Sequence, residues 1–258
     1  MNTGLGLASA AVLAAAAAGA AVGLRTRGVV ARHAGSEGER LRRPHAGAEG
    51  ERLGHGQAGA GEERSRRAWP PVGAVEAVTA LALAALALRA AWPGLPAEEG
   101  VTPVGRAAEL LAFGWLAAVA VALAFVDAAV HRLPDRLTLA AYLGTVTLLA
   151  VSAAVDGRPG DLLGAGLGGV ALAGFYLVLF LVNPAGMGLG DVKFAGGLGT
   201  ALGWLGWNTL VTGTFLGLLA GGLYGAALVV LRRAGRKSEI PFGPFMAVGA
   251  LAAALGAL

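Results

Sequence analysis

Two aspartates stand at the margins of long apolar segments in this sequence. Asp127 comes directly after the apolar run Trp115 to Val126, and Asp191 lies in residues 186–193, which read Gly-Met-Gly-Leu-Gly-Asp-Val-Lys. A carboxylate at the edge of a membrane-length segment is expensive to keep, so both side chains are candidates for chemistry. Two carboxylates brought close together share one proton, because both cannot ionise cheaply. One can then activate water while the other donates a proton to a scissile carbonyl, which is the chemistry of aspartic proteolysis.

The neighbours of the two aspartates sharpen this hypothesis. Gly188 and Gly190 leave the backbone free to turn tightly and to approach a substrate strand without an intervening side chain. Pro134 is well placed to begin a helix after a short turn, and Asp135 suits the first turn of that helix.

Each polar residue also has a purely structural interpretation. Asp127 could cap a helix end, and Asp135 could only complement a helix dipole. Lys193 adds a charge close to Asp191, but a lysine at a helix end also anchors that end among lipid headgroups. The sequence leaves these alternatives open.

The composition predicts a polytopic membrane protein. The chain has 258 residues, of which 56% are hydrophobic, and a mean hydropathy of +0.66, which is more apolar surface than a soluble domain of this size can bury. The 43 glycines suit helices that approach closely in a bilayer. The absence of cysteine excludes disulfides, thiol nucleophiles and cysteine-bound zinc. Three of the four histidines lie in a polar loop without metal-ligand spacing, so we expect no metal site.

The apolar segments predict an all-α membrane helix bundle with about eight transmembrane helices. The predicted spans are 3–24, 72–92, 107–126, 137–155, 161–182, 192–207, 209–231 and 241–258. We interpret 1–24 as a membrane anchor rather than a removed signal peptide, because no positive charge precedes its apolar core. Residues 25–71 form a linking insert, and 72–258 form the helical core that carries both aspartates.

The basic residues predict the orientation of the bundle. If the spans alternate, the loops on one side, together with Lys193, hold 17 of the 20 lysines and arginines. The positive-inside rule places those loops in the cytoplasm, and both aspartates lie on that side. The net charge of +4 therefore reflects orientation, and we expect no nucleic-acid partner. The loops concerned are 25–71, 127–136, 183–191 and 232–240.

The insert contains a tandem repeat, because residues 33–41 recur with small changes as 45–53. A period of 12 residues is too short and too polar for a solenoid. The segment lacks the apolar residues that would offset the entropy cost of ordering it, so we expect a flexible cytoplasmic insert. The functional alternative is a platform for anionic lipid headgroups.

Taken together, the motifs resemble those of the type IV prepilin peptidase family of membrane aspartic proteases. One match is Asp127 followed by Leu133 to Thr138, and a second is Gly188 to Lys193, which fits the family's Gly-x-Gly-Asp-x-Lys signature. A third is residues 240–249, which look like the family's opening of the last helix. The resemblance covers roughly residues 107–258.

The resemblance implies removal of the short basic leader of prepilins or pseudopilins at the cytoplasmic face of the bacterial inner membrane. It implies that Asp127 and Asp191 are the catalytic pair, that Gly188, Gly190, Pro134 and Lys193 shape the site or bind substrate, and that no cofactor is needed. The implied partners are the prepilin-type substrate and the lipid bilayer, and the oligomeric state stays open.

The amino-terminal part departs from the family. Longer members carry a cytoplasmic domain there, often with zinc-binding Cys-x-x-Cys motifs, and are associated with N-methylation of the product. We expect this chain to lack that domain, because it has no cysteine, and this puts methyltransferase activity in doubt. Two other functions use the same residues differently. In a proton-coupled transporter or channel the carboxylates would line an aqueous path, and a non-enzymatic pilus or secretion assembly factor would tolerate loss of both.

Overall fold

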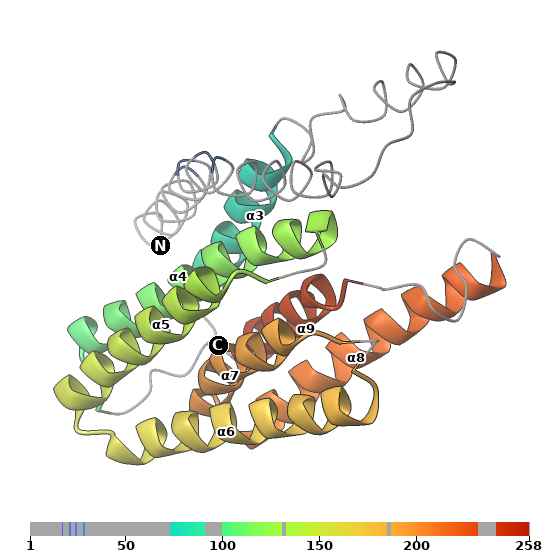
Figure 1. Cartoon of the computed structure of the whole chain (residues 1–258). Helices are drawn as coiled ribbons and strands as arrows, with labels where there is room; N and C mark the ends of the chain where they lie inside the picture. The colour runs from blue at the N-terminus through green and yellow to red at the C-terminus, as the bar shows by residue number, and fades with distance from the viewer. Residues whose placement is uncertain are drawn as a thin grey trace, which may run out of the picture.

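A computed structural model describes residues 73–90, 100–130, 133–184, 187–231 and 241–257, together with the single positions 17, 21, 24 and 28. All the regular elements in these ranges are α-helices, as predicted (Figure 1). The predicted anchor 1–24 and insert 25–71 lie almost wholly outside the described residues. The helices are α3 (Ala74–Ala90), α4 (Pro103–Val130), α5 (Asp135–Asp156), α6 (Pro159–Val182), α7 (Leu189–Trp204), α8 (Trp207–Val230) and α9 (Gly243–Ala257).

Local sequence explains where α5 begins and ends. Pro134 precedes its first residue with φ −65°, and the Pro134 carbonyl accepts the N–H groups of Leu137 and Thr138. The helix ends at Gly157, whose φ of +65° is left-handed and costs a glycine little. A proline then opens α6 two residues later, where its missing N–H is not needed.

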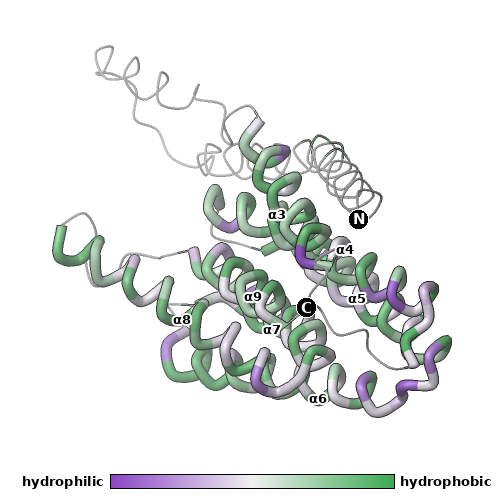
Figure 2. The backbone as a smooth tube through the Cα atoms, turned by 180° about the vertical axis from the view of Figure 1, so that it is seen from behind, coloured by the Kyte–Doolittle hydropathy of each residue, from purple (hydrophilic) through white to green (hydrophobic). Residues whose placement is uncertain are grey.

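Four of the described helices are long and apolar enough to cross a membrane: Pro103–Ala129, Asp135–Asp156, Pro159–Val182 and Trp207–Val230. Helices α3, α7 and α9 have 17, 16 and 15 residues, fewer than the roughly 20 that span a hydrocarbon core of about 30 Å. The described part of the chain therefore does not confirm the predicted count of about eight spans. Many large apolar residues on α6 and α8 are exposed, as expected for lipid-facing surfaces, and both helices are largely hydrophobic in composition (Figure 2).

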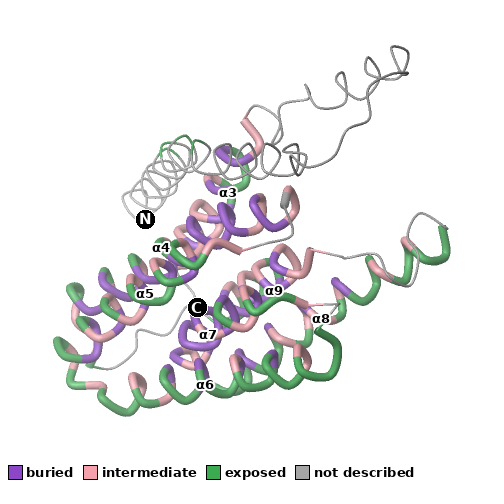
Figure 3. The backbone as a smooth tube through the Cα atoms, viewed as in Figure 1, coloured by how far each residue is buried: buried purple, intermediate pink, exposed green. Residues whose placement is uncertain are grey.

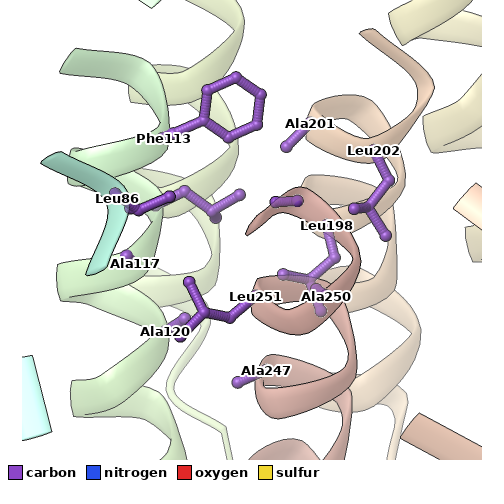
Figure 4. A pocket seen from close by; sticks show the side chains of 12 residues that line it. Leu86, Phe113, Ala117, Ala120, Leu198, Ala201, Leu202, Ala247, Ala250 and Leu251 are labelled. Atoms are coloured by element: carbon purple, nitrogen blue, oxygen red, sulfur yellow. The ribbon is translucent and has the colours of Figure 1, made fainter. Parts of the chain in front are cut away.

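Helix α7 is the centre of the bundle. It contacts α4, α5, α6, α8 and α9, and ten of its 16 residues are buried, whereas α6 and α8 expose one side along much of their length (Figure 3). A small cavity of about 40 Å³ lies where α3 and α4 face α7 and α9 (Figure 4). Its lining consists only of Leu, Phe and Ala side chains, so it offers no hydrogen bond to a water.

Glycines let α6 and α7 cross with their backbones in contact. A Cβ added at Gly168 would lie 2.6 Å from the carbonyl oxygen of Gly199, and one added at Gly203 would lie 2.7 Å from that of Gly164. Each helix thus carries a pair of glycines four residues apart, the small-residue pattern of close packing in membranes. This crossing places the start of α7 against the end of α6.

Contacts between helix termini show which termini lie together at each end of the bundle. At one end, the first turn of α7 packs against the α4–α5 turn, and Asp127 near the end of α4 contacts Gly243 at the start of α9. At the other end, Arg89 in the last turn of α3 donates to the carbonyl of Leu255 in the last turn of α9. The end that contains Asp127 also contains Asp191, and we call it the aspartate end.

Candidate active site

Asp127 lies in the last turn of α4 and is only 4% exposed. This corrects the expectation that the helix stops before it, because Ala128, Ala129 and Val130 extend the apolar run and continue the helix by a turn. The Oδ2 atom of Asp127 accepts the backbone N–H of Gly243, the first residue of α9, at 2.9 Å. The side chain therefore caps α9, a different helix from its own, whose N–H groups need acceptors there.

Asp191 lies at the start of α7 and caps that same helix. It lies in the first turn, is 6% exposed, and its Oδ2 accepts the backbone N–H of Gly188 at 3.0 Å. Its Oδ1 is buried and has no hydrogen-bond partner among the described residues. Each aspartate thus accepts a hydrogen bond from the start of a helix with one oxygen, and the second oxygen of Asp191 has no such partner among the described residues.

The two carboxyl groups influence each other. Burial and, to a smaller extent, the charge of Asp127 raise the pKa of Asp191 to about 6, although the hydrogen bond from the N–H of Gly188 partly opposes the shift. The charge of Asp127 reaches Asp191 through a buried environment in which electrostatic effects are strong. The structure therefore brings together the two residues that sequence motifs singled out, as a pair of buried, electrostatically coupled carboxyl groups.

Gly190 and Gly243 allow the close packing that positions this pair, because a larger residue would not fit at either place. A Cβ on Gly243 would lie 3.0 Å from Asp127 Oδ2, and a Cβ on Gly190 would lie 2.7 Å from the Cβ of Leu133 in the α4–α5 turn. Gly188 is different, because the nearest atom to its added Cβ, Asp191 Oδ2, is 3.7 Å away.

The expectation of a tight glycine turn is wrong for both signature glycines. Gly188 has extended backbone, with φ −92°, and Gly190 lies inside α7. What Gly190 provides is a close approach between α7 and the turn that follows Asp127.

Lys193 and Pro134 lie beside the pair rather than within it. Lys193 Nζ forms a 2.6 Å ion pair with Asp135 Oδ1, and both side chains are largely exposed. Asp135 is in the first turn of α5, as predicted, and Pro134 sets the start of that helix. The ion pair joins the starts of α5 and α7 across the surface of the aspartate end.

Two aromatic residues next to the pair were not predicted from the sequence. Tyr176 on α6 is 2% exposed and lies within electrostatic reach of Asp191. Its ring centroid is 5.9 Å from that of Phe242, the residue before Gly243. Phe242 belongs to the segment 240–249 that opens the last helix, which was the available signal, whereas Tyr176 sits in an apolar run with nothing to mark it.

A second polar cluster lies at the opposite end of the bundle. Glu109 is 2% exposed, with its Oε2 atom 3.5 Å from Arg106 Nη1 and 3.9 Å from Arg158 Nη1. The Arg158 guanidinium also lies over the ring of Trp204 at the end of α7. This cluster ties α4, the α5–α6 turn and α7 together, far along the helices from the aspartates. No group of three or more metal-binding side chains gathers among the described residues.

Comparison with known proteins identifies the family. The model of the type IV leader peptidase family matches residues 114–226, which include both aspartates. Leader peptidase HopD of Salmonella typhimurium is 34% identical over 135 residues, which are 51% of this chain and 84% of that protein. This chain belongs to the type IV leader peptidase family.

Longer relatives match over a similar number of residues. The prepilin leader peptidase/N-methyltransferase of Aeromonas salmonicida is 36% identical over 143 residues, covering 53% of this chain and 47% of that protein. The protein of the same name from Bacillus subtilis is 30% identical over 138 residues, covering 54% and 52%. The chain thus spans about half the length of these relatives. No solved structure matches it.

Proposed function

We propose that this protein is a membrane aspartic endopeptidase that removes the basic leader of type IV prepilins or pseudopilins. One observation carries the proposal: Asp127 and Asp191 are buried, come from different helices, and are electrostatically coupled at one end of the bundle. A pair of this kind holds a single proton between two carboxyl groups near working pH. Membership of the leader peptidase family supports the same reaction.

In the proposed reaction, Asp191 carries the shared proton, because its raised pKa lets it stay protonated closer to neutrality than an ordinary aspartate. Asp127, as the carboxylate, takes a proton from water while the water oxygen bonds to the scissile carbonyl carbon. Asp191 donates its proton to the carbonyl oxygen, which gives a neutral tetrahedral intermediate. Collapse of this intermediate breaks the C–N bond: one hydroxyl returns its proton to the Asp191 carboxylate as the C=O bond re-forms, and the Asp127 carboxyl gives its proton to the leaving nitrogen.

The fixed helix ends support this chemistry by limiting movement of the pair. The N–H of Gly243 holds Asp127, and the N–H of Gly188 holds Asp191, so each carboxyl has one oxygen anchored to backbone. Anchored groups need little rearrangement as charge develops during reaction. Gly190 keeps the two helices that carry the pair close together.

The charge pattern supports a site at the cytoplasmic face of the bacterial inner membrane. Of the loops predicted to be cytoplasmic, the described residues of 127–136 and 183–191 lie at the aspartate end, and acidic side chains there suit a basic leader. The substrate and the face of the membrane are parts of the same proposal.

The proposal is tested by co-expression with a prepilin-type substrate from the source genome and by measuring leader removal with a gel shift. We expect a shift that depends on this protein. A processed product whose amino terminus maps to another bond, or no processing in the presence of a substrate that a known leader peptidase cleaves, would contradict it. The mass of the mature amino terminus tests N-methylation separately, since the names of several relatives include that activity.

A further inference from the structure

Tyr176 is buried on α6 beside the first turn of α7, with only 2% of its surface exposed. Helices α6 and α7 run antiparallel, since residues later in α6 meet residues earlier in α7. A Cβ added at Gly196 of α7 would lie 3.8 Å from Ala173 Cβ of α6. Tyr176 follows Ala173 by about one helical turn. It therefore meets α7 about one turn before Gly196, beside Asp191.

The ring of Tyr176 also packs against the start of α9. Its centroid is 5.9 Å from that of Phe242, the residue directly before Gly243. The N–H of Gly243 donates to Asp127 Oδ2 at 2.9 Å. Tyr176 thus contacts the segment that holds Asp127 and lies beside the helix start that carries Asp191.

The hydroxyl of a buried tyrosine needs a hydrogen-bond partner, because an unpaired polar group inside a protein costs free energy. Asp191 has a matching need, since its Oδ1 atom is buried and has no hydrogen-bond partner among the described residues. Tyr176 and Asp191 lie within electrostatic reach of each other. Where two buried polar groups stand near each other without direct contact, one bridging water satisfies both.

Other polar side chains around Asp191 are engaged elsewhere. Lys193 Nζ pairs with Asp135 Oδ1 at 2.6 Å on the exposed surface. The Thr138 hydroxyl of α5 donates to the backbone carbonyl of Asp135 at 3.0 Å. The described residues of α9 contain no hydroxyl and no ionisable side chain, and α6 contains no hydroxyl besides Tyr176. Among the described residues, Tyr176 is therefore the hydroxyl placed to serve Asp191.

We propose that Tyr176 is a positioning residue, whose hydroxyl holds Asp191 Oδ1 through one bridging water. Its catalytic consequence rests on the proposed function. The N–H of Gly188 occupies Oδ2, so the shared proton is carried by Oδ1. When Asp191 gives that proton to the scissile carbonyl, the bridged hydroxyl donates to the new carboxylate. Hydrogen bonds to a charged oxygen are stronger than those to a neutral one, so Tyr176 stabilises the product of this step.

The first test needs no substrate. Tyr176→Phe removes the hydroxyl but keeps the ring against Phe242 and leaves Asp127 in place. Infrared titration of the protein in phospholipid vesicles measures the pKa of Asp191, whose carboxyl band is identified by its loss in Asp191→Asn. We expect this pKa to be higher in Tyr176→Phe by about 0.7, a roughly fivefold change in the ionisation equilibrium, because the carboxylate loses a stabilising hydrogen bond. An unchanged pKa would overturn the inference.

Tyr224 on α8 provides a matched control. Its ring also packs against α9, with its centroid 5.2 Å from that of Phe245, and it is the one ionisable side chain of α8. Its side chain is 47% exposed, so its hydroxyl reaches solvent rather than a buried partner. Tyr224→Phe should leave the pKa of Asp191 unchanged. An equal rise in both variants would overturn the specific role of Tyr176.

The second test separates positioning from packing. We expect Tyr176→Phe to lower kcat for leader removal roughly fivefold at the wild-type optimum pH, with KM and the thermal midpoint unchanged. Because cleavage requires protonated Asp191, the alkaline limit of kcat should move to higher pH together with the pKa of Asp191. Tyr176→Leu, which also removes the ring, should lower the thermal midpoint as well. A lower kcat in Tyr176→Phe with an unmoved pH profile would reduce Tyr176 to a packing residue.

The two tests separate failure of this inference from failure of the proposed function. If the wild-type protein cleaves its substrate, and Tyr176→Phe changes neither the pKa of Asp191 nor the pH profile, the inference alone fails. If Tyr176→Phe raises the pKa of Asp191 and the wild-type protein cleaves no prepilin-type substrate, the contact stands and the proposed function fails.

Discussion

Replacement of Gly190 by alanine should disable the site while leaving the bundle folded. The new Cβ would lie 2.7 Å from Leu133 Cβ and 3.4 Å from the Leu133 backbone nitrogen, whereas carbon atoms prefer separations of about 3.5–4.0 Å. The first turn of α7 and the α4–α5 turn must therefore separate by about 1 Å. Asp191 is the next residue on one side of this contact, and Asp127 lies six residues before Leu133 on the other.

The size of the effect follows from that displacement. A misplacement of about 1 Å in a catalytic group costs about 100-fold in rate, so we expect kcat for leader removal to fall by about that factor. Overpacking costs about 1–3 kcal/mol, but alanine in a helix regains about 1 kcal/mol relative to glycine. The thermal midpoint should consequently fall by only a few degrees.

Two controls use the same substitution where space is available. Gly196→Ala is also inside α7, and its nearest neighbour, Ala173 Cβ, is 3.8 Å away. Gly188→Ala keeps the N–H that holds Asp191 and meets no atom closer than 3.7 Å. Both should retain kcat within about threefold, which corresponds to less than 1 kcal/mol. The assay is cleavage of a prepilin-type substrate by purified protein in proteoliposomes. Wild-type kcat for Gly190→Ala, or equal losses in all three variants, would refute this reasoning.

Three further predictions concern other parts of the fold. Gly168→Ala should lower the free energy of unfolding by about 1–3 kcal/mol, because its Cβ meets the carbonyl of Gly199, whereas Gly174→Ala on the same helix meets nothing and should not; equal thermal midpoints would contradict this. Because the pKa of Asp191 is raised to about 6 in the fold, its contribution to stability is fully present below about pH 4 and lost as pH rises through 6, on the order of 3 kcal/mol. The thermal midpoint of the wild-type protein should therefore fall more over that pH window than the midpoint of Asp191→Asn. If the two midpoints change equally with pH, the pKa of Asp191 is not raised. Glu109→Gln should cost about 1–2 kcal/mol by removing the carboxylate that two partly exposed arginines share, since Arg158 keeps its ion pair with Asp161, and the cleavage rate per folded molecule should not change. A lower rate at unchanged stability would connect this cluster to the site.

The helices were predictable because the lengths of the apolar segments and the charged loops between them indicate where helices lie. Each predicted span from residue 72 onward coincides over most of its length with one helix of the structure. The predicted boundaries were less accurate where residues of high helix propensity follow the end of the predicted span, as after Asp127, because alanine continues a helix regardless of hydropathy. Short helices such as α7 also look like spans in sequence, although their burial comes from neighbouring helices.

The position of the two aspartates at one end of the bundle was predictable from the sequence, but the contacts that support them were not. Motif spacing marks Asp127 and Asp191, and alternation of the spans places them at one end. The contacts of Gly190 with Leu133 and of Asp127 with Gly243 join segments that are far apart in the chain, and no pattern of residue types encodes such distances. With 43 glycines in the sequence, the few that permit backbone contact cannot be told from the others without coordinates.

The central claim is that Asp127 and Asp191 act together on the scissile bond, and single Asp→Asn variants test it most directly. Asparagine has nearly the same shape and can still accept the N–H of Gly243 or Gly188, so both variants should keep the thermal midpoint of wild type measured near pH 5. The account predicts that each loses at least about 10³-fold in kcat with purified protein, and that the double variant is no worse than either. Cleavage by either single variant within tenfold of wild type would contradict the account.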